Sequence, residues 1–232
     1  MPSYLKTNRH IESQIVDARE RAQRLDDYMT AHSSKEDDYM ARLYRATQTH
    51  LLRPRMASGH LQGLLLRMLT QMIKPRVVVE IGTYSGYSAL SMAAGMDEGG
   101  IIYSFEINDE QEDFTKPWLE SSPYPAKVEM IIGNALDLLP PMDIKADMAF
   151  IDGDKRQYAN YYTLIMSKLK AGGWLLADNT LWDGHVTDPD YDGDAQTKGI
   201  KAFNDLVAAD PKVEKVIIPL RDGLTLIRKL SD

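Results

Sequence analysis

VVVEIGTYSGYS, residues 77–88, decides the fold class of this chain. Its first five residues are mostly apolar without strict alternation, which is typical of a strand buried on both faces of a parallel sheet. Gly82 and Gly86 then permit a tight turn and a close approach of the backbone to a ligand. The stretch therefore predicts a strand, a binding turn and the start of a helix.

The same alternation of strand and helix continues along the chain. Further strands are predicted at residues 101–105, 128–132, 148–151 and 174–177. Helices are predicted at residues 87–95, 109–119, 135–139, 158–169 and 199–209. This order favours a doubly wound α/β fold. The apolar runs 213–218 and 224–227 flank an Asp-Gly turn, so we expect the sheet to end in an antiparallel pair.

The first 75 residues follow a helical pattern instead. Apolar residues recur at helical spacing, at Ile11, Ile15 and Val16, at Met40, Leu43 and Tyr44, and at Leu61, Leu64, Leu65, Met68, Leu69 and Met72. We expect the last group to face the core and Ser58 to cap its helix. The prediction is one domain over residues 1–232, with N-terminal helices at 1–75 and a Rossmann-like core at 76–232.

Composition excludes several classes of function. The 232 residues include no cysteine, which rules out a thiolate zinc site, an iron–sulfur cluster and a cysteine nucleophile. A formal charge of −7 argues against a general binder of nucleic acid or anionic membranes. The N-terminus has no signal-peptide pattern and no apolar run is long enough to span a bilayer. A cytoplasmic protein is expected.

Glu106 lies at the end of the second predicted strand, where an acid can bind the two hydroxyls of a ribose. Together with the glycine turn it predicts a nucleoside-type site, although a plain turn and a surface glutamate would look similar. Gly82 and Gly86 are four residues apart and do not form the G-x-G-x-x-G pattern. This spacing favours a nucleoside without a pyrophosphate over a dinucleotide.

Asp152, Asp178 and Asn179 each follow an apolar strand. Because ligands of open α/β sheets bind beyond the carboxyl ends of the strands, we expect these three side chains to converge. Oxygen donors of this kind suit a hard cation such as Mg²⁺, Mn²⁺ or Ca²⁺. Aspartate and asparagine are also good helix N-caps, so capping is the competing interpretation.

Four segments carry a family resemblance: VVVEIGTYSGYSAL, FIDGDKRQY, LLADNTLWDGHV and PLRDGLTLIRK. In this order they resemble the cation-dependent class I O-methyltransferases, the caffeoyl-CoA and catechol O-methyltransferase-like enzymes that use S-adenosylmethionine. The resemblance covers roughly residues 55–230. It implies a seven-stranded Rossmann-like sheet with an antiparallel last strand, a bound Mg²⁺ or similar cation, a homodimer, and a small aromatic acceptor with vicinal hydroxyls.

The resemblance also implies roles for individual residues. For the cofactor these are Met56, Ser58, Glu80, Gly82, Tyr84, Ser88, Glu106, Gly133, Asn134, Ala135, Asp152 and Asp154. Met56 and Ser58 match a segment that closes over the methionine end, although residues 58–63 read SGHLQG and depart from the commoner S-P-E-x-G pattern. The metal ligands would be Asp152, Asp178 and Asn179, and Lys155 stands at the place of the catalytic base. Trp182 would either stack on an aromatic acceptor or merely pack.

Three other functions compete with this one. Some relatives methylate a modified tRNA base, which the acidic charge of this chain counts against. A dinucleotide-dependent oxidoreductase is opposed by the glycine spacing. A non-catalytic cofactor-binding protein would have no chemical need for Asp152, Lys155, Asp178 and Asn179 together.

Overall fold

The computed structural model describes residues 20–232. The chain divides into two compact units, residues 1–37 and 38–232. Within the first unit, residues 20–31 form a helix. The predicted helical pattern at Ile11, Ile15 and Val16 lies outside the described residues.

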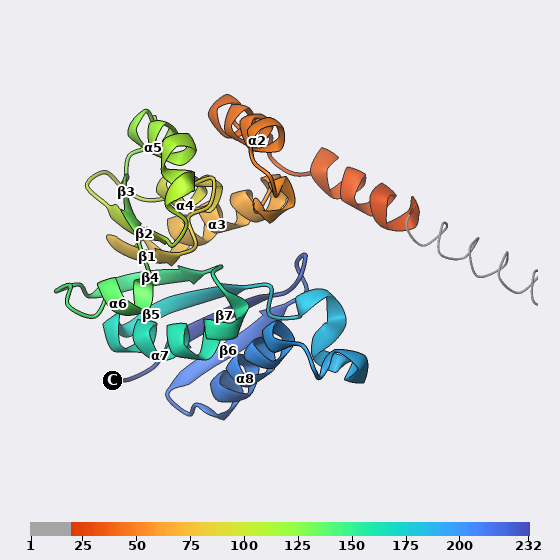
Figure 1. Cartoon of the computed structure of the whole chain (residues 1–232). Coiled ribbons are helices and arrows are strands. Elements are labelled where there is room, and N and C mark those ends of the chain that lie inside the picture. The colour runs from red at the N-terminus through yellow and green to blue at the C-terminus, as the bar shows by residue number, and fades with distance from the viewer. Residues whose placement is uncertain (1–19) are drawn as a thin grey trace, which may run out of the picture. The chain divides into compact units, whose positions relative to one another are not determined.

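A seven-stranded sheet in the order β3-β2-β1-β4-β5-β7-β6 forms the second unit (Figure 1). β1 pairs in parallel with β2 and β4, which pair in parallel with β3 and β5. β7 runs antiparallel to both β5 and β6, which confirms the predicted antiparallel strand. The strands are β1 (Val77–Ile81), β2 (Ile101–Glu106), β3 (Lys127–Ile132), β4 (Ala146–Ile151), β5 (Leu169–Asp178), β6 (Val213–Ile218) and β7 (Leu224–Lys229).

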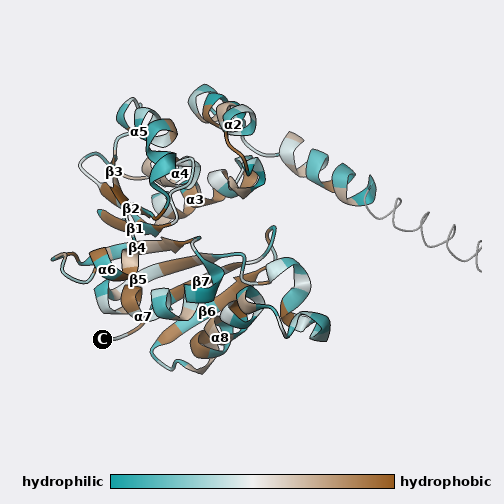
Figure 2. Ribbon diagram, viewed as in Figure 1, coloured by the Kyte–Doolittle hydropathy of each residue, from teal (hydrophilic) through white to brown (hydrophobic). Residues whose placement is uncertain are grey.

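Helices cover the two faces of the sheet. One face packs against α2 (Asp38–His50), α3 (His60–Ile73), α4 (Tyr87–Ala93) and α5 (Glu112–Glu120). The other packs against α6 (Ala135–Leu138), α7 (Tyr158–Lys168) and α8 (Ala195–Ala209). In β1, Val78 belongs to the first core and Val79 to the second, as expected of a strand buried on both sides. Figure 2 shows hydrophobic residues along the strands.

Short 3₁₀ helices connect these elements. They are η1 (Pro54–Met56), η2 (Asp109–Gln111), η3 (Lys155–Gln157), η4 (Trp182–Thr187) and η5 (Pro189–Tyr191). β5 begins five residues earlier than predicted, and its pairing with β4 shifts register between Ala146 and Met148. α8 begins at Ala195 rather than Gly199, because Asp194 caps its first turn by accepting a hydrogen bond from the Thr197 amide.

The predicted core face of α3 is only partly correct. Leu65 and Leu69 pack against the core. The fully buried residues, however, are Gln62, Gly63, Leu66 and Thr70, whereas Met68 and Met72 are 50% and 78% exposed. The helix is oriented so that Gly63 faces α4. An added Cβ on Gly63 would lie 2.7 Å from the Ser91 Oγ, so only glycine permits this close packing. The expected cap at Ser58 is also wrong, since Gly59 is the N-cap and makes no side-chain capping bond.

Within residues 20–232, no helix combines the length and the hydropathy that crossing a bilayer requires.

Candidate active site

The strand order changes direction between β1 and β4, and the carboxyl ends of these two strands meet there. This is the usual ligand position in open α/β sheets. Gly82, directly after β1, has φ +103°. An added Cβ would lie 2.3 Å from the main-chain oxygen of Asp152. Glycine at this position therefore allows the turn after β1 to pass close to the end of β4.

A pocket opens at this junction. It is lined by Met56, Ala57, Ser58, Gly82, Thr83, Tyr84, Ser85, Tyr87, Ser88 and Asp152. Six of the residues predicted to contact the cofactor are among them. Ser85 is buried, and its Oγ has no hydrogen-bond partner within the described part of the chain. Because a buried hydroxyl rarely stays unpaired, Ser85 is a binding candidate that the sequence reasoning missed, although it belongs to the glycine turn itself.

Glu80 lies in β1 behind this pocket and is fully buried. Its carboxylate accepts hydrogen bonds from Ser88 Oγ, at 2.6 Å, and from Ser104 Oγ. Burial raises the pKa of Glu80 from 4.5 to about 7, and the two serine hydrogen bonds offset part of that rise. Glu80 therefore connects the pocket residue Ser88 to the core of the sheet.

Glu106, at the end of β2, organises the neighbouring turns. Its carboxylate accepts hydrogen bonds from the amides of Tyr84 (2.7 Å) and Asn108 (2.9 Å). Its main-chain oxygen accepts from the Gly133 amide at 2.7 Å, which joins the turn after β3 to this edge. Asn134 caps α6, and the adjacent Ala135 is buried. Since a carboxylate has about four acceptor sites, two amide bonds leave Glu106 able to accept from hydroxyls.

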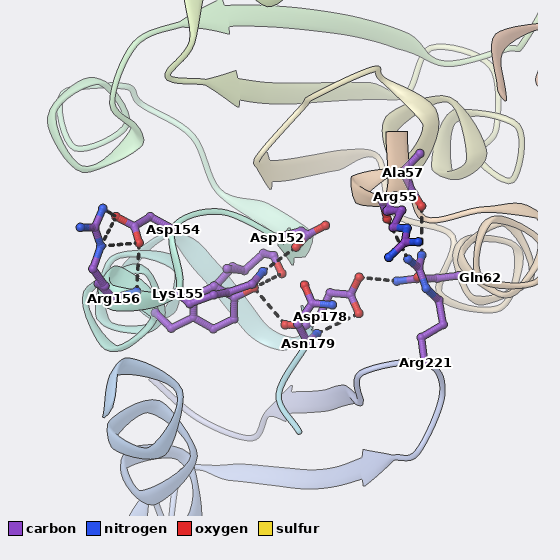
Figure 3. A network of polar contacts seen from close by, with 12 residues as sticks. Arg55, Ala57, Gln62, Asp152, Asp154, Lys155, Arg156, Asp178, Asn179 and Arg221 are labelled. Carbon is purple, nitrogen blue, oxygen red and sulfur yellow. Dashed lines mark hydrogen bonds and ion pairs between the residues drawn. The ribbon is translucent and has the colours of Figure 1, made fainter. Parts of the chain in front are cut away.

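The two acidic residues at the ends of β4 and β5 are register neighbours. Ile151 pairs with Ala177, so the next residues, Asp152 and Asp178, emerge side by side (Figure 3). Asp178 is 2% exposed. Burial raises the pKa of Asp178, and the negative charge of Asp152 raises it further. Two close carboxylates with this mutual repulsion form a set of donors that suits a divalent cation.

Asn179 follows Asp178 in a left-handed conformation with φ 58°, and its amide donates to the Asp178 Oδ1 at 2.9 Å. Among residues 20–232, no group of three His, Cys, Asp or Glu side chains is arranged to hold a metal ion. A cation at this edge would therefore use the carboxylates of Asp152 and Asp178 and the side-chain oxygen of Asn179. Water or oxygens of the methyl acceptor would complete its ligands. Neither Asp152 nor Asp178 is the N-cap of a helix, so the competing capping interpretation fails for both.

Lys155 begins η3, three residues after Asp152. Its side chain is 9% exposed, and Nζ donates to the Asp152 Oδ1 at 2.6 Å and to the Tyr158 Oη at 2.7 Å. The Tyr158 hydroxyl donates in turn to the main-chain oxygen of Asp178 at 2.9 Å. Trp182 packs against the core, with the Lys155 Nζ 6.0 Å from its ring centroid. Tyr158 thus ties the lysine to the end of β5, a role that the sequence analysis did not assign.

Asp154 pairs with Arg156. Its carboxylate accepts from the Arg156 amide at 3.1 Å and forms an ion pair with the Arg156 guanidinium at 2.7 Å. Like five other predicted cofactor residues, it is not among the residues that line the pocket. Figure 3 shows Asp154 and Arg156 together, separated from Asp152 by Lys155. Asp154 therefore serves as the N-cap of η3, the element that carries Lys155.

This strand order, with a pocket at its switch point, is that of a Rossmann-like methyltransferase. The sequence model of a family described as O-methyltransferase matches residues 30–230, and the chain belongs to that family. A caffeoyl-CoA O-methyltransferase from Petroselinum crispum is 34% identical, with 85% of this chain and 86% of the relative covered. Tricin synthase 2 from Oryza sativa subsp. japonica is 31% identical, with 90% and 76% covered.

Solved structures agree with the sequence relatives. The SAH-bound methyltransferase PaMTH1 from Podospora anserina matches with a TM-score of 0.83 and 26% identity over 90% of this chain and 95% of that one. The O-methyltransferase TomG from Streptomyces achromogenes, in complex with SAM, matches with a TM-score of 0.81 and 29% identity, covering 89% and 96%. This chain is an S-adenosylmethionine-dependent O-methyltransferase, and the oxidoreductase alternative is wrong.

Proposed function

We propose that this enzyme methylates a hydroxyl of a small aromatic acceptor, either a catechol or a hydroxycinnamoyl thioester. The observation that carries the proposal is the position of Asp152, which lines the pocket, pairs with Lys155 and neighbours Asp178. The carboxyl edge of β4 and β5 would bring a cofactor, a cation and a base within reach of one methyl acceptor. Relatives described as caffeoyl-CoA O-methyltransferases support the choice of acceptor class.

The cofactor would bind along the turns after β1, β2 and β3. Met56, Ser58, Gly82, Tyr84 and Ser88 would surround its methionine end, and Ser85 would offer the unpaired hydroxyl described above. The free acceptor sites of Glu106 would take the ribose hydroxyls. The turn with Gly133, Asn134 and Ala135 would lie by the adenine. Asp154, which caps η3, would also contact the cofactor.

A divalent cation held by Asp152, Asp178 and Asn179 would lower the pKa of a bound phenol and orient its oxygens. The neutral amine form of Lys155 would accept the phenolic proton at Nζ. The phenolate oxygen would then form a bond to the methyl carbon as the carbon–sulfur bond breaks, and that electron pair would stay on the sulfur as the thioether of S-adenosylhomocysteine. Lys155 is held in place for this step by its contacts with Asp152 and Tyr158.

The test is a methyl-transfer screen over catechols, hydroxycinnamoyl thioesters and tRNA, each with and without Mg²⁺. Cation-dependent transfer to an aromatic acceptor is the expected result. Transfer to tRNA, with binding that weakens steeply as salt rises, would instead support the tRNA alternative. We also propose a homodimer, which light scattering of the purified protein tests directly.

A further inference from the structure

A chain of polar contacts joins Asp178 to the pocket wall at residues 56–58, and it runs through Arg221. This arginine lies in the turn between β6 and β7, in a left-handed conformation with φ 50°. Its Nη1 donates to the main-chain oxygens of Ala57, at 3.1 Å, and Ser58. Its Nη2 reaches the Arg55 oxygen at 3.4 Å. One guanidinium thus contacts two carbonyls of the wall segment and that of the preceding Arg55 (Figure 3).

Gln62 continues this chain of contacts toward the cation side. Its side chain is 1% exposed, and its Oε1 accepts from the Arg221 Nη1 at 2.8 Å. Its Nε2 donates to the Asp178 Oδ2 at 2.6 Å. The amide has a single favourable orientation, since a flip would set its NH₂ group against the guanidinium and its oxygen against the carboxylate. Gln62 therefore transmits the position of Arg221 to Asp178 through a rigid, buried group.

The wall segment is short, and its amides make only local backbone hydrogen bonds, from the Met56 amide to Arg53 and from the Ala57 amide to Pro54. Met56 is half exposed, whereas Ala57 and Ser58 are buried. These two buried residues are the ones whose main-chain oxygens accept from the Arg221 Nη1. Arg221, by contrast, is anchored in a hairpin of the central sheet. Its planar fork presents five donors in fixed directions on separate nitrogens, whereas a lysine ammonium has three donors on one nitrogen.

We propose that Arg221 and Gln62 are positioning residues that couple the cofactor wall at residues 56–58 to the cation ligand Asp178. The inference rests on the proposed roles of Met56, Ser58 and Asp178. A cation on Asp178 orients the Gln62 amide, Gln62 orients Arg221, and Arg221 holds the wall against the cofactor. Because coupling between two sites is reciprocal, each ligand should tighten the binding of the other.

The experiment measures binding rather than turnover. Calorimetry gives the dissociation constant of S-adenosylhomocysteine with and without Mn²⁺, and that of Mn²⁺ with and without S-adenosylhomocysteine. The variants are Arg221→Met, Arg221→Lys, Gln62→Met and the double methionine variant. Arg76→Met is the matched control, because Arg76 is an exposed arginine directly before β1, at the edge of the sheet opposite the carboxyl ends of the strands that carry Asp152 and Asp178. Circular dichroism and thermal unfolding establish that each variant is folded.

In the wild type we expect Mn²⁺ to tighten S-adenosylhomocysteine binding by roughly 5-fold or more, within the usual range of coupling. Arg221→Met and Gln62→Met should each reduce that factor toward 1. The factor for Arg221→Lys should be close to that for Arg221→Met, because lysine keeps the charge and loses the planar guanidinium. The coupling factor of the double variant should be no smaller than that of the single variant with the smaller factor, since both residues belong to one chain of contacts. Arg76→Met should match the wild type.

Several results would overturn the coupling. One is a wild type that binds both ligands independently. Another is a pair of folded single variants that keep the wild-type factor, and a third is strict additivity in the double variant. If Arg221→Met does not fold, Arg221→Lys and Gln62→Met decide the question. A wild type that binds no S-adenosylhomocysteine at all would instead contradict the proposed cofactor site, so the two failures are distinguishable.

Discussion

Replacing Glu80 with glutamine should remove a large pH dependence from the stability of the protein. Glu80 is fully buried, and burial raises its pKa from 4.5 to about 7. Below pH 4.5, the folded and unfolded chains both carry this proton. Between pH 4.5 and 7 the folded chain keeps a proton that the unfolded chain has lost, so the free energy of unfolding falls as the pH rises. Above pH 7 the folded chain has lost the proton as well, and the free energy of unfolding falls no further on account of Glu80.

The size of the loss follows from the two pKa values, 4.5 and about 7. At 1.36 kcal/mol for each pH unit, ionising Glu80 in the folded state costs about 3 kcal/mol. Glutamine does not titrate, so Glu80→Gln escapes this cost. It keeps one acceptor for the serine hydroxyls, while the other serine must turn to accept from its NH₂ group. That second effect is independent of pH and shifts the whole curve by a constant.

The measurement is urea unfolding of cofactor-free wild type and Glu80→Gln between pH 4.5 and 8. The stability of the variant relative to the wild type should rise by about 3 kcal/mol over this range. Glu98→Gln is the control, since Glu98 is exposed in the loop before β2 and its replacement should leave the two curves parallel. If the free energies of unfolding of wild type and Glu80→Gln change with pH in parallel, the reasoning is refuted. Parallel curves would mean that Glu80 titrates alike in the folded and unfolded chains.

Three further predictions address the catalytic edge. Lys155→Ala should lower turnover roughly 100-fold or more while leaving S-adenosylhomocysteine affinity nearly unchanged, and unchanged turnover on a confirmed acceptor would exclude Lys155 as the base. EDTA should abolish methyl transfer and Mg²⁺ or Mn²⁺ should restore it, whereas full activity in chelator would contradict the cation mechanism. In Gly199→Ala the new Cβ would lie 2.3 Å from the Lys155 main-chain oxygen, so η3 must move. We expect a loss of about 1–3 kcal/mol in unfolding free energy together with lower turnover. Gly193→Ala, which meets nothing within 4 Å, should change neither.

The sheet could be predicted from the sequence because its signals are local. β1 and β6 have the predicted ends, since each strand stops at a turn residue, Gly82 after β1 and Pro219 after β6. The hairpin prediction worked for the same reason. The face of α3 could not be predicted in this way. Its leucines and methionines surround much of the helix, so the buried face depends on which side fits closely against α4, and Gly63 decides that.

The acidic residues of the site were also predictable, because a parallel register carries Asp152 and Asp178 to one edge without any information from the loops. Their support was not predictable. Gln62 and Arg221 are 159 residues apart, and Arg221 in an exposed turn has no local signal of function. Gln62 did carry a signal, as a polar side chain among the leucines of α3. A buried amide needs partners for both its ends. A glutamine that lies beside the leucines of a core helix should therefore be searched for the acid and the base that it bridges.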